Sequence, residues 1–278
     1  MIEAILKRRS VRTYLKEPLT SHELNIIQDI LDRSSSRRGI FGFQVRFFFL
    51  NHLSSFDDEA KRIGTYGFVK NAPAFIGGVI ENKFNAIVDF GYLFEHIILE
   101  ATEHDFGTVW LGGTFDRNAF KSEVNSGEVI PAISPVGYSE DHMSFREKSI
   151  RLFVHANQRK SYKELFFEEN IETPILDQNN SKNSLVKYLE FVQAGPSASN
   201  KQPWRIVLNQ NKAHFYLKRT ENYGTSLPFD IQALDMGIAL CHFEEGLKSD
   251  QRNYTFENDP SASIIPGLVY IITVVVAI

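Results

Sequence analysis

The sequence predicts an α+β fold built from two related halves. Helical periodicity and short runs of β-branched and aromatic residues alternate along the 278-residue chain. Three residues of one predicted helix also recur in a second predicted helix, each 146 positions later: Asp89 as Asp235, Gly91 as Gly237, and His96 as His242. The order of elements repeats as well, so we interpret this spacing as an internal repeat rather than a chance match of three positions.

The first half is predicted to open with two helices. Ile2, Ile5 and Leu6 repeat at helical spacing, and Thr20 or Ser21 can cap a second helix that has Glu23 in its first turn. The other predicted elements of this half are strands at 45–50 and 74–80, a long helix over 86–104, and short strands at 109–111 and 136–138.

A polar, turn-rich junction at 170–183 separates this half from the next. After it the pattern restarts with a helix face that contains Leu185, Leu189 and Val192. The following elements are a turn at 195–203, strands at 204–208 and 213–217, a helix over 231–248 and a closing strand at 268–278. We therefore divide the chain into residues 1–169 and 170–278.

The composition excludes several classes of protein. With 43% hydrophobic and 23% charged residues, the chain is not wholly disordered. A net charge of −4 provides no basic excess for nucleic acid, and the longest apolar run is shorter than the ~20 residues that span a bilayer. A lone cysteine, Cys241, excludes an internal disulfide and fits a reducing compartment, and the opening residues are not typical of a signal peptide. We expect a cytoplasmic protein that binds neither nucleic acid nor membranes.

Two segments have the chemistry of a binding site. The first is Arg8-Arg9-Ser10-Val11-Arg12, in which Arg8 and Arg12 share a face if the helix continues, whereas Arg9 joins them only if the helix ends or frays. Guanidinium groups beside a hydroxyl suit a terminal phosphate. The alternative is a basic helix end that faces solvent.

The second segment is the turn Gly195-Pro196-Ser197-Ala198-Ser199-Asn200-Lys201-Gln202-Pro203. It joins a helix to a strand, and Pro203 keeps the preceding residue extended. The hydroxyl and carboxamide groups could contact a planar heterocycle with mixed donors and acceptors. The alternative is a well-formed connection with no ligand.

Together these segments resemble the FMN-dependent nitroreductase family. The resemblance rests on Arg-Arg-Ser-Val-Arg-Thr-Tyr near the N-terminus and on Pro-Ser-Ala-Ser-Asn-Lys-Gln-Pro-Trp after a helix. It also includes Val-Trp-Leu-Gly-Gly-Thr-Phe-Asp at 109–116, Val-Gly-Tyr at 136–138 and the basic segment at 159–165. These motifs lie within residues 1–165 and 184–208.

The order of the motifs departs from the family. Ordinary members carry the Pro-Ser-x-x-Asn turn soon after the basic segment and place FMN between two subunits. Here residues 34–43 lack that turn, which occurs only in the second half, and the second half lacks the basic segment. The resemblance therefore implies a nitroreductase-like tandem fusion, folded as an intramolecular pseudo-dimer with one FMN site. We expect a monomer, because the two halves mimic a dimer.

The resemblance also implies a set of site residues. The phosphate and the flavin edge would be held by Arg8, Arg9, Ser10, Arg12 and either Arg159 or Lys160. The ring and ribityl chain would lie against Gly112 and Gly113 and against Pro196, Ser197, Ala198, Ser199, Asn200 and Gln202. A contact of Tyr66 with the other ring edge is the least supported assignment. No residue is predicted to bind a metal, although His96, Glu100 and His104 have helical spacing that could hold one.

The function that the resemblance implies is NAD(P)H-dependent reduction of a nitroaromatic- or quinone-like acceptor in two half-reactions at FMN. No side-chain nucleophile is needed, because the flavin carries the chemistry. Two alternatives are a flavin-storing or sensing module without NAD(P)H turnover, and a degenerate fusion retained as a structural protein.

Overall fold

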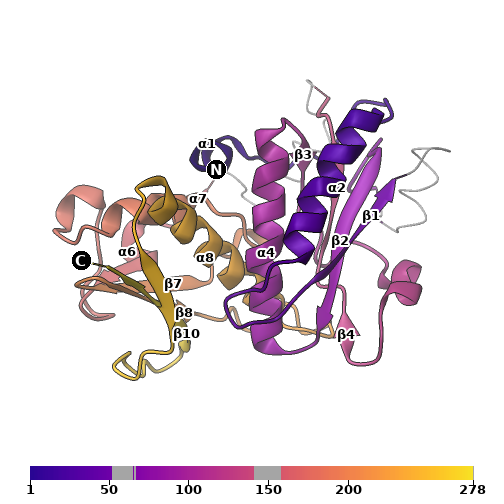
Figure 1. Cartoon of the computed structure of the whole chain (residues 1–278). Coiled ribbons are helices and arrows are strands. Elements are labelled where there is room, and N and C mark those ends of the chain that lie inside the picture. The colour runs from indigo at the N-terminus through magenta and orange to yellow at the C-terminus, as the bar shows by residue number, and fades with distance from the viewer. Residues whose placement is uncertain (52–64, 66, 141–157, 278) are drawn as a thin grey trace.

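A computed structural model of the chain describes residues 1–51, 65, 67–140 and 158–277. Two long helices, α4 (Phe84–Glu103) and α8 (Ile231–Ser249), pack against each other in the middle of the molecule, and each lies against the sheet of its own half (Figure 1). Both helices are buried over most of their length, so apolar residues occur all around them. The predicted α+β architecture with two related halves is confirmed.

The first half contains one antiparallel sheet with the order β1-β2-β5-β3, and β4 pairs with β2. Its strands are β1 (Arg46–Asn51), β2 (Ala74–Glu81), β3 (Gly107–Thr108), β4 (Glu128–Val129) and β5 (Ile133–Gly137). Its other helical elements are α1 (Ile2–Lys7), α2 (Ser21–Ser35) and the 3-10 helix η1 (Arg117–Glu123).

The second half repeats this order as β7-β8-β10-β9 and adds β6 beside β7. Its strands are β6 (Phe166–Glu168), β7 (Trp204–Asn209), β8 (Lys212–Leu217), β9 (Tyr254–Glu257) and β10 (Val269–Val276). Its helical elements are α6 (Tyr162–Leu165), η2 (Gln178–Asn180), η3 (Val186–Tyr188), α7 (Leu189–Ala194) and η4 (Ala198–Asn200). Strand β6 precedes the boundary predicted at residue 170 yet pairs in parallel with β7, so the chain crosses into the second sheet before that boundary.

The crossing of α4 and α8 has the reciprocity of a two-fold interface. A Cβ on Gly91 would lie 2.2 Å from the carbonyl oxygen of Leu234, and one on Gly237 would lie 2.1 Å from that of Val88. Val88 and Leu234 are themselves 146 positions apart, so the same contact is made twice with the halves exchanged. Glycine is required at both positions because no side chain fits between the helices.

Most predicted elements are confirmed, and Thr20 caps α2 in a capping box with Glu23. The prediction missed β4, β6 and β9. The first two are only two and three residues long, whereas β9 alternates between half-buried and exposed residues and could have been found from its sequence. The first predicted helix is confirmed as α1, but it does not continue through the basic segment, because it ends at Lys7 and Arg8 is extended, with φ −55° and ψ 129°. The expectation that Arg8 and Arg12 share a helix face is therefore wrong. Among the described residues, no helix is long and apolar enough to cross a membrane.

Candidate functional site

A cavity of about 460 Å³ lies between the two halves. It is bordered by the segment after α1, the turn after β3, the turn after α7 and the first turns of α8. Most of the residues predicted to hold a cofactor line it: Arg8, Ser10, Arg12, Gly112, Gly113, Arg159, Pro196, Ser197, Ala198, Ser199 and Asn200. The structure thus brings together parts of the chain that are far apart in the sequence.

The end of α1 explains which residues of the basic segment reach the cavity. After Lys7 the chain is extended, and it is tied to β3 by the Val11 N–H, which donates to the Thr108 carbonyl at 2.9 Å. Successive side chains of an extended segment point to opposite sides, so Arg8, Ser10 and Arg12 share one side. Arg9 is exposed, does not line the cavity and donates to Ser139 Oγ at 3.1 Å instead.

The turn at 196–200 is held in an unusual backbone conformation. Ser199, Asn200 and Gln202 have φ values of 46°, 55° and 46°, in the left-handed region that L residues rarely adopt. The expectation that Pro203 keeps Gln202 extended is therefore wrong. The Ala198 N–H donates to Asp235 Oδ1 at 2.9 Å, and the Gln202 N–H donates to Ser197 Oγ at 2.9 Å. Such strain persists only where the surroundings fix the backbone, and it is common at binding sites.

Gln202 and Lys160 brace this turn and do not line the cavity. The Gln202 side chain is buried, and its Oε1 accepts a hydrogen bond from the Lys160 backbone N–H at 2.9 Å. Its Nε2 donates to the carbonyl and to Oδ1 of Asn200, both at 3.1 Å. Their role here is to hold the strained turn against the start of the segment that leads to β6.

Arg159 is the cation that joins this turn to the basic segment. Its Nη1 donates to Asn200 Oδ1 at 2.7 Å, and its Nη2 donates to the Ala194 carbonyl at 2.9 Å. Burial, reinforced by the charge of Arg8, lowers the pKa of Arg159 to about 10, so the guanidinium stays protonated at neutral pH. Arg8, Arg12 and Arg159 therefore give one part of the cavity a concentrated positive charge.

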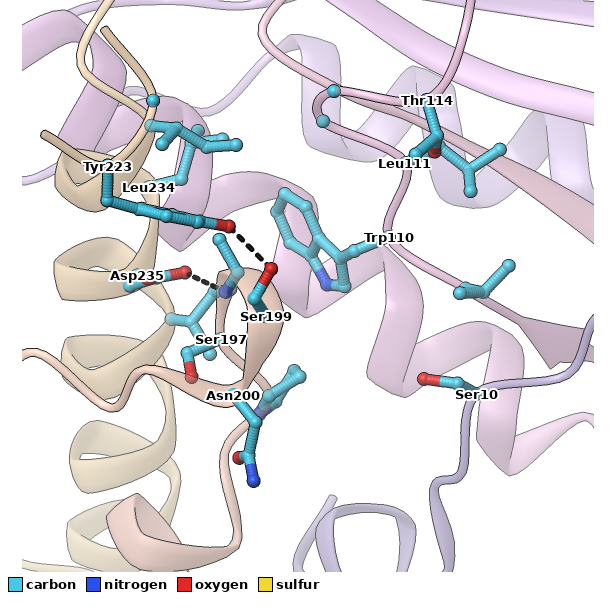
Figure 2. A pocket seen from close by; sticks show the side chains of 18 of the residues that line it. Ser10, Trp110, Leu111, Thr114, Ser197, Ser199, Asn200, Tyr223, Leu234 and Asp235 are labelled. Atoms are coloured by element: carbon cyan, nitrogen blue, oxygen red, sulfur yellow. Dashed lines mark hydrogen bonds between the residues drawn. The ribbon is translucent and has the colours of Figure 1, made fainter. Parts of the chain in front are cut away.

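The remaining wall is mostly apolar and includes residues that sequence reasoning missed. Trp110, Leu227 and Leu234 line it, together with Tyr223, whose hydroxyl donates to Ser199 Oγ at 2.8 Å (Figure 2). Trp110 immediately precedes Leu111-Gly112-Gly113, which could have drawn attention to it, whereas Tyr223 lies in a turn without a recognisable motif. The predicted contact of Tyr66 lies outside the described residues.

The two predicted glycines differ in their surroundings. A Cβ on Gly112 would lie 2.9 Å from Ile231 Cδ1, so this glycine permits close packing of the turn on α8. A Cβ on Gly113 would meet no atom of the described residues within 4 Å. The main chain at Gly113 is therefore open to close approach by a ligand.

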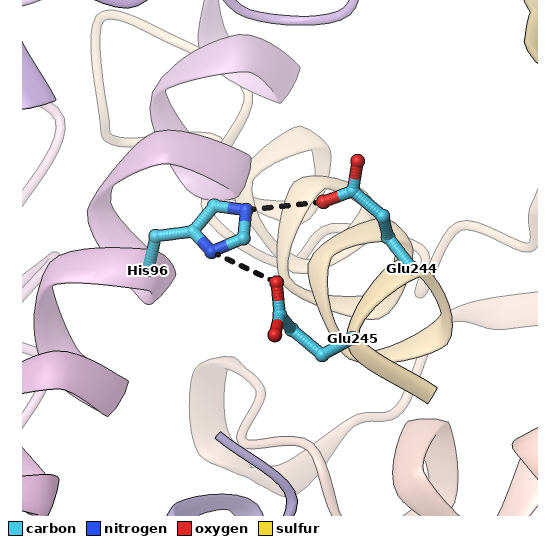
Figure 3. Close-up of side chains that lie close together, drawn as sticks. All are labelled: His96, Glu244 and Glu245. Atoms are coloured by element: carbon cyan, nitrogen blue, oxygen red, sulfur yellow. Dashed lines mark ion pairs between the residues drawn. The ribbon is translucent and has the colours of Figure 1, made fainter. Parts of the chain in front are cut away.

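A second polar cluster lies at the other side of the α4–α8 contact. His96 faces Glu244 at 3.3 Å through Nε2 and Glu245 at 3.5 Å through Nδ1 (Figure 3). Lys248 donates to both carboxylates, at 2.7 and 2.9 Å. Burial acts to raise the pKa of Glu244, but contact with His96 and the charge of Lys248 lower it to about 2. Because Lys248 already pairs with both carboxylates, the cluster is better described as an ionic network between the halves than as a metal centre. The absence of a metal stays a prediction.

Comparisons with known proteins agree with this architecture. The family model described as "Putative TM nitroreductase" matches residues 1–247. A putative nitroreductase from Thermotoga maritima shares 21% identity with a TM-score of 0.59, over 99% of this chain and 92% of that one. This likeness concerns the fold, which is nitroreductase-like.

Two smaller solved structures match about half of this chain. A nitroreductase family protein from Clostridium novyi NT has 20% identity and a TM-score of 0.41, over 50% of this chain and 84% of its own. An FMN-dependent nitroreductase from Clostridium difficile R20291 has 19% identity and a TM-score of 0.42, over 52% of this chain and 90% of its own. No curated protein matches the sequence. Since the family model covers residues 1–247 of 278, the chain belongs to the "Putative TM nitroreductase" family.

Proposed function

We propose that the chain binds one FMN in the cavity between its halves and uses it for NAD(P)H-dependent reduction of a nitroaromatic- or quinone-like acceptor. The observation that supports this most is the composition of the cavity. Its cationic side comes from Arg8 and Arg12 of the first half, and the strained turn at 196–200 comes from the second. A fusion of two subunits that once shared a site would leave these complementary parts on one chain.

The cavity has the chemical features that FMN needs. Three arginines offer multiple N–H donors to a phosphate, and Ser10 adds a hydroxyl beside them. The apolar wall and the open main chain at Gly113 suit a planar ring. The volume of about 460 Å³ falls within the range of roughly 300–1,000 Å³ found for small-molecule sites.

In this proposal the protein binds and orients FMN, and the cofactor supplies the chemistry. The chemistry that FMN would supply when bound is hydride transfer from NAD(P)H and electron transfer to the second substrate. Arg159 supplies a permanent cation for the phosphate, and Asn200 fixes the direction of that guanidinium through its 2.7 Å hydrogen bond. Trp110 and Leu234 line the cavity and would exclude water from one side of a bound ring. No general acid or base of the chain is assigned to either half-reaction.

The test is to purify the protein without added flavin, record its visible spectrum and measure FMN released per chain after reconstitution. We expect a ratio near one, a single chain in solution, and anaerobic bleaching of the bound flavin by NADH or NADPH. A ratio near two would contradict the single shared site. Binding without bleaching would identify a storage or sensing module, and a protein that cannot be reconstituted would refute the proposal.

A further inference from the structure

The indole of Trp110 is fixed on several sides before any ligand arrives. Its ring meets Phe94 edge to face, with centroids 4.9 Å apart at 90°, and Phe90 at 6.5 Å and 71°. Its Nε1–H donates to Glu95 Oε2 at 2.7 Å. The ring is half-buried and lines the cavity, where it projects from the first half toward the turn that carries Ser199 (Figure 2). Because its N–H is already engaged, the surface it offers to the cavity is aromatic carbon.

Glu95 is held in turn by His242, and the hydrogen-bond pattern determines where the protons lie. The His242 Nδ1 is 2.7 Å from the Phe191 carbonyl, which can only accept, so Nδ1 carries a proton. The His242 Nε2 is 2.8 Å from Glu95 Oε1, and both side chains are fully buried. A neutral imidazole with its proton on Nδ1 would place a lone pair against the carboxylate. One further proton must therefore lie between Glu95 and His242, which makes this pair a strong, directional support.

The pseudo-two-fold arrangement provides an internal comparison. Adding 146 to the numbers of Trp110 and Glu95 gives Phe256 and Cys241, and subtracting 146 from that of His242 gives His96. Phe256 has no N–H on its ring, and His96 contacts Glu244 and Glu245 instead. The hydrogen-bonded series Trp110–Glu95–His242 is thus present on the side of the α4–α8 contact that borders the cavity. It is not repeated at the equivalent positions. A feature needed only to pack the two helices would have no reason to be restricted to that side.

We propose that Trp110 is the fixed aromatic wall against which the planar ring of the ligand packs, and that Glu95 and His242 are positioning residues that hold the indole in that place. The identification of this ring as the flavin rests on the proposed function. Because an aromatic ring that is already ordered loses little conformational entropy on binding, the support increases affinity through preorganisation. The apolar wall also favours a flat ring over a polar group at this position.

The experiment compares variants of Glu95 that differ only in their hydrogen bonds. In Glu95→Gln the carbonyl can accept from Trp110 Nε1 while the amide donates to a neutral His242, so the support is kept. Glu95→Met has a similar volume and no acceptor, so the support is lost. His96→Gln is the matched control, because it changes the counterpart histidine at the same helix contact.

Two measurements are made on each variant. The first is hydrogen exchange of the two indole N–H signals in protein labelled with ¹⁵N-tryptophan, assigned with Trp110→Phe, and it needs no ligand. The second is the Kd for FMN. In Glu95→Met we expect faster exchange at Trp110 and FMN binding about tenfold weaker, the factor that loss of one such hydrogen bond gives. Glu95→Gln and His96→Gln should stay within about twofold of the parent, whatever their melting temperatures.

Each outcome decides between the possibilities. A folded Glu95→Met with unchanged exchange at Trp110 would remove Glu95 as a positioning residue. If Glu95→Met does not fold, Trp110→Ala tests the wall, and unchanged FMN affinity there would overturn the proposal. If the parent binds no FMN, the proposed function fails, whereas the exchange data still decide whether Glu95 holds the indole.

Discussion

The turns after α2 and α7 occupy equivalent places in the two halves but serve different ends. Each is anchored by the aspartate of its own long helix. Asp89 accepts hydrogen bonds from the backbone N–H groups of Phe41 and Phe43, and Asp235 accepts one from Ala198. The anchoring carboxylate has therefore been kept in both copies of the repeat, whereas the residues it anchors have diverged.

The content of each turn follows from what surrounds it. In the first half, Phe41 and Phe43 pack on the core, and a Cβ on Gly39 would lie 2.2 Å from Asp89 Cγ. The turn is therefore pressed onto its anchor. In the second half, the turn has strained polar residues that border the cavity, and Asp235 Oδ2 has no hydrogen-bond partner among the described residues. The same scaffold thus holds apolar residues against the core in one copy and polar residues at the border of the cavity in the other.

The largest effect is expected where the halves are still equivalent. Gly91→Ala and Gly237→Ala should each destabilise the fold by about 3 kcal/mol, because each new Cβ would press on a carbonyl of the opposite helix. Thermal unfolding measures both. Costs that differ by more than about 1 kcal/mol between the two variants would contradict a reciprocal contact.

The next largest effect concerns FMN affinity, which should distinguish an arginine that lines the cavity from one in the first-half turn. Arg8→Ala should weaken FMN binding by about ten- to a hundredfold, since a hydrogen bond to a charged group contributes about 1.5–3 kcal/mol. Arg37→Ala is the control, because Arg37 lies in the first-half turn and does not line the cavity. Titration of flavin fluorescence measures both affinities, and equal losses would place the site elsewhere.

The two anchors themselves can be compared by exchanging each carboxylate for an amide. In the parent, both carboxylate oxygens of Asp89 accept hydrogen bonds from backbone N–H groups. Asp89→Asn replaces one of these oxygens with an amide N–H group, which must then face a backbone donor. In Asp235→Asn, the amide can replace Oδ2, which accepts no hydrogen bond from the part of the chain that the structure describes. Chemical denaturation should show Asp89→Asn to be the less stable by about 1–3 kcal/mol. The reverse order would mean that the cost of burying a charge, rather than the loss of hydrogen bonds, determines how much each aspartate contributes to stability.

The smallest effect concerns pH. Burial raises the pKa of Asp89 to about 6, although the backbone N–H groups act to lower it. Because the folded state then binds the proton more tightly than the unfolded state, the stability this group contributes is present at low pH and is lost as the pH rises through 6. Between pH 5 and 7 the loss is about 1 kcal/mol.

The corresponding measurement is the melting temperature at the two pH values. From pH 5 to pH 7 the melting temperature of the parent should fall by a few degrees, and that of Asp89→Asn should fall by less. Burial shifts the pKa of Asp235 in the same direction, so Asp235→Asn should also flatten the profile. A parent whose stability rises between pH 5 and 7 would show that other groups outweigh the two anchors.

Much of the fold could be predicted because its signals are local. The periodicity of residues 86–104 and 231–248 marks two buried helices, and the spacing of 146 relates them. The two segments that line the cavity were also recognisable, since arginines beside a serine and a Ser/Asn-rich turn have side chains suited to a phosphate and to a polar ring. Whether these segments form one cofactor site stays a prediction until FMN is measured.

Only the tertiary structure decided how individual side chains are used. Arg8 and Arg9 are neighbours in the sequence, yet α1 ends at Lys7, and the extended chain sends one to the cavity and the other to Ser139. Gln202 belongs to the predicted turn, yet its side chain braces Lys160. Trp110 carries no local signal of its orientation, because its N–H is fixed by Glu95 and, through Glu95, by a histidine from the other half. Local pattern indicates where helices, buried strands and polar turns lie. The ends of elements and the directions of side chains depend on partners that only folding brings within hydrogen-bonding distance.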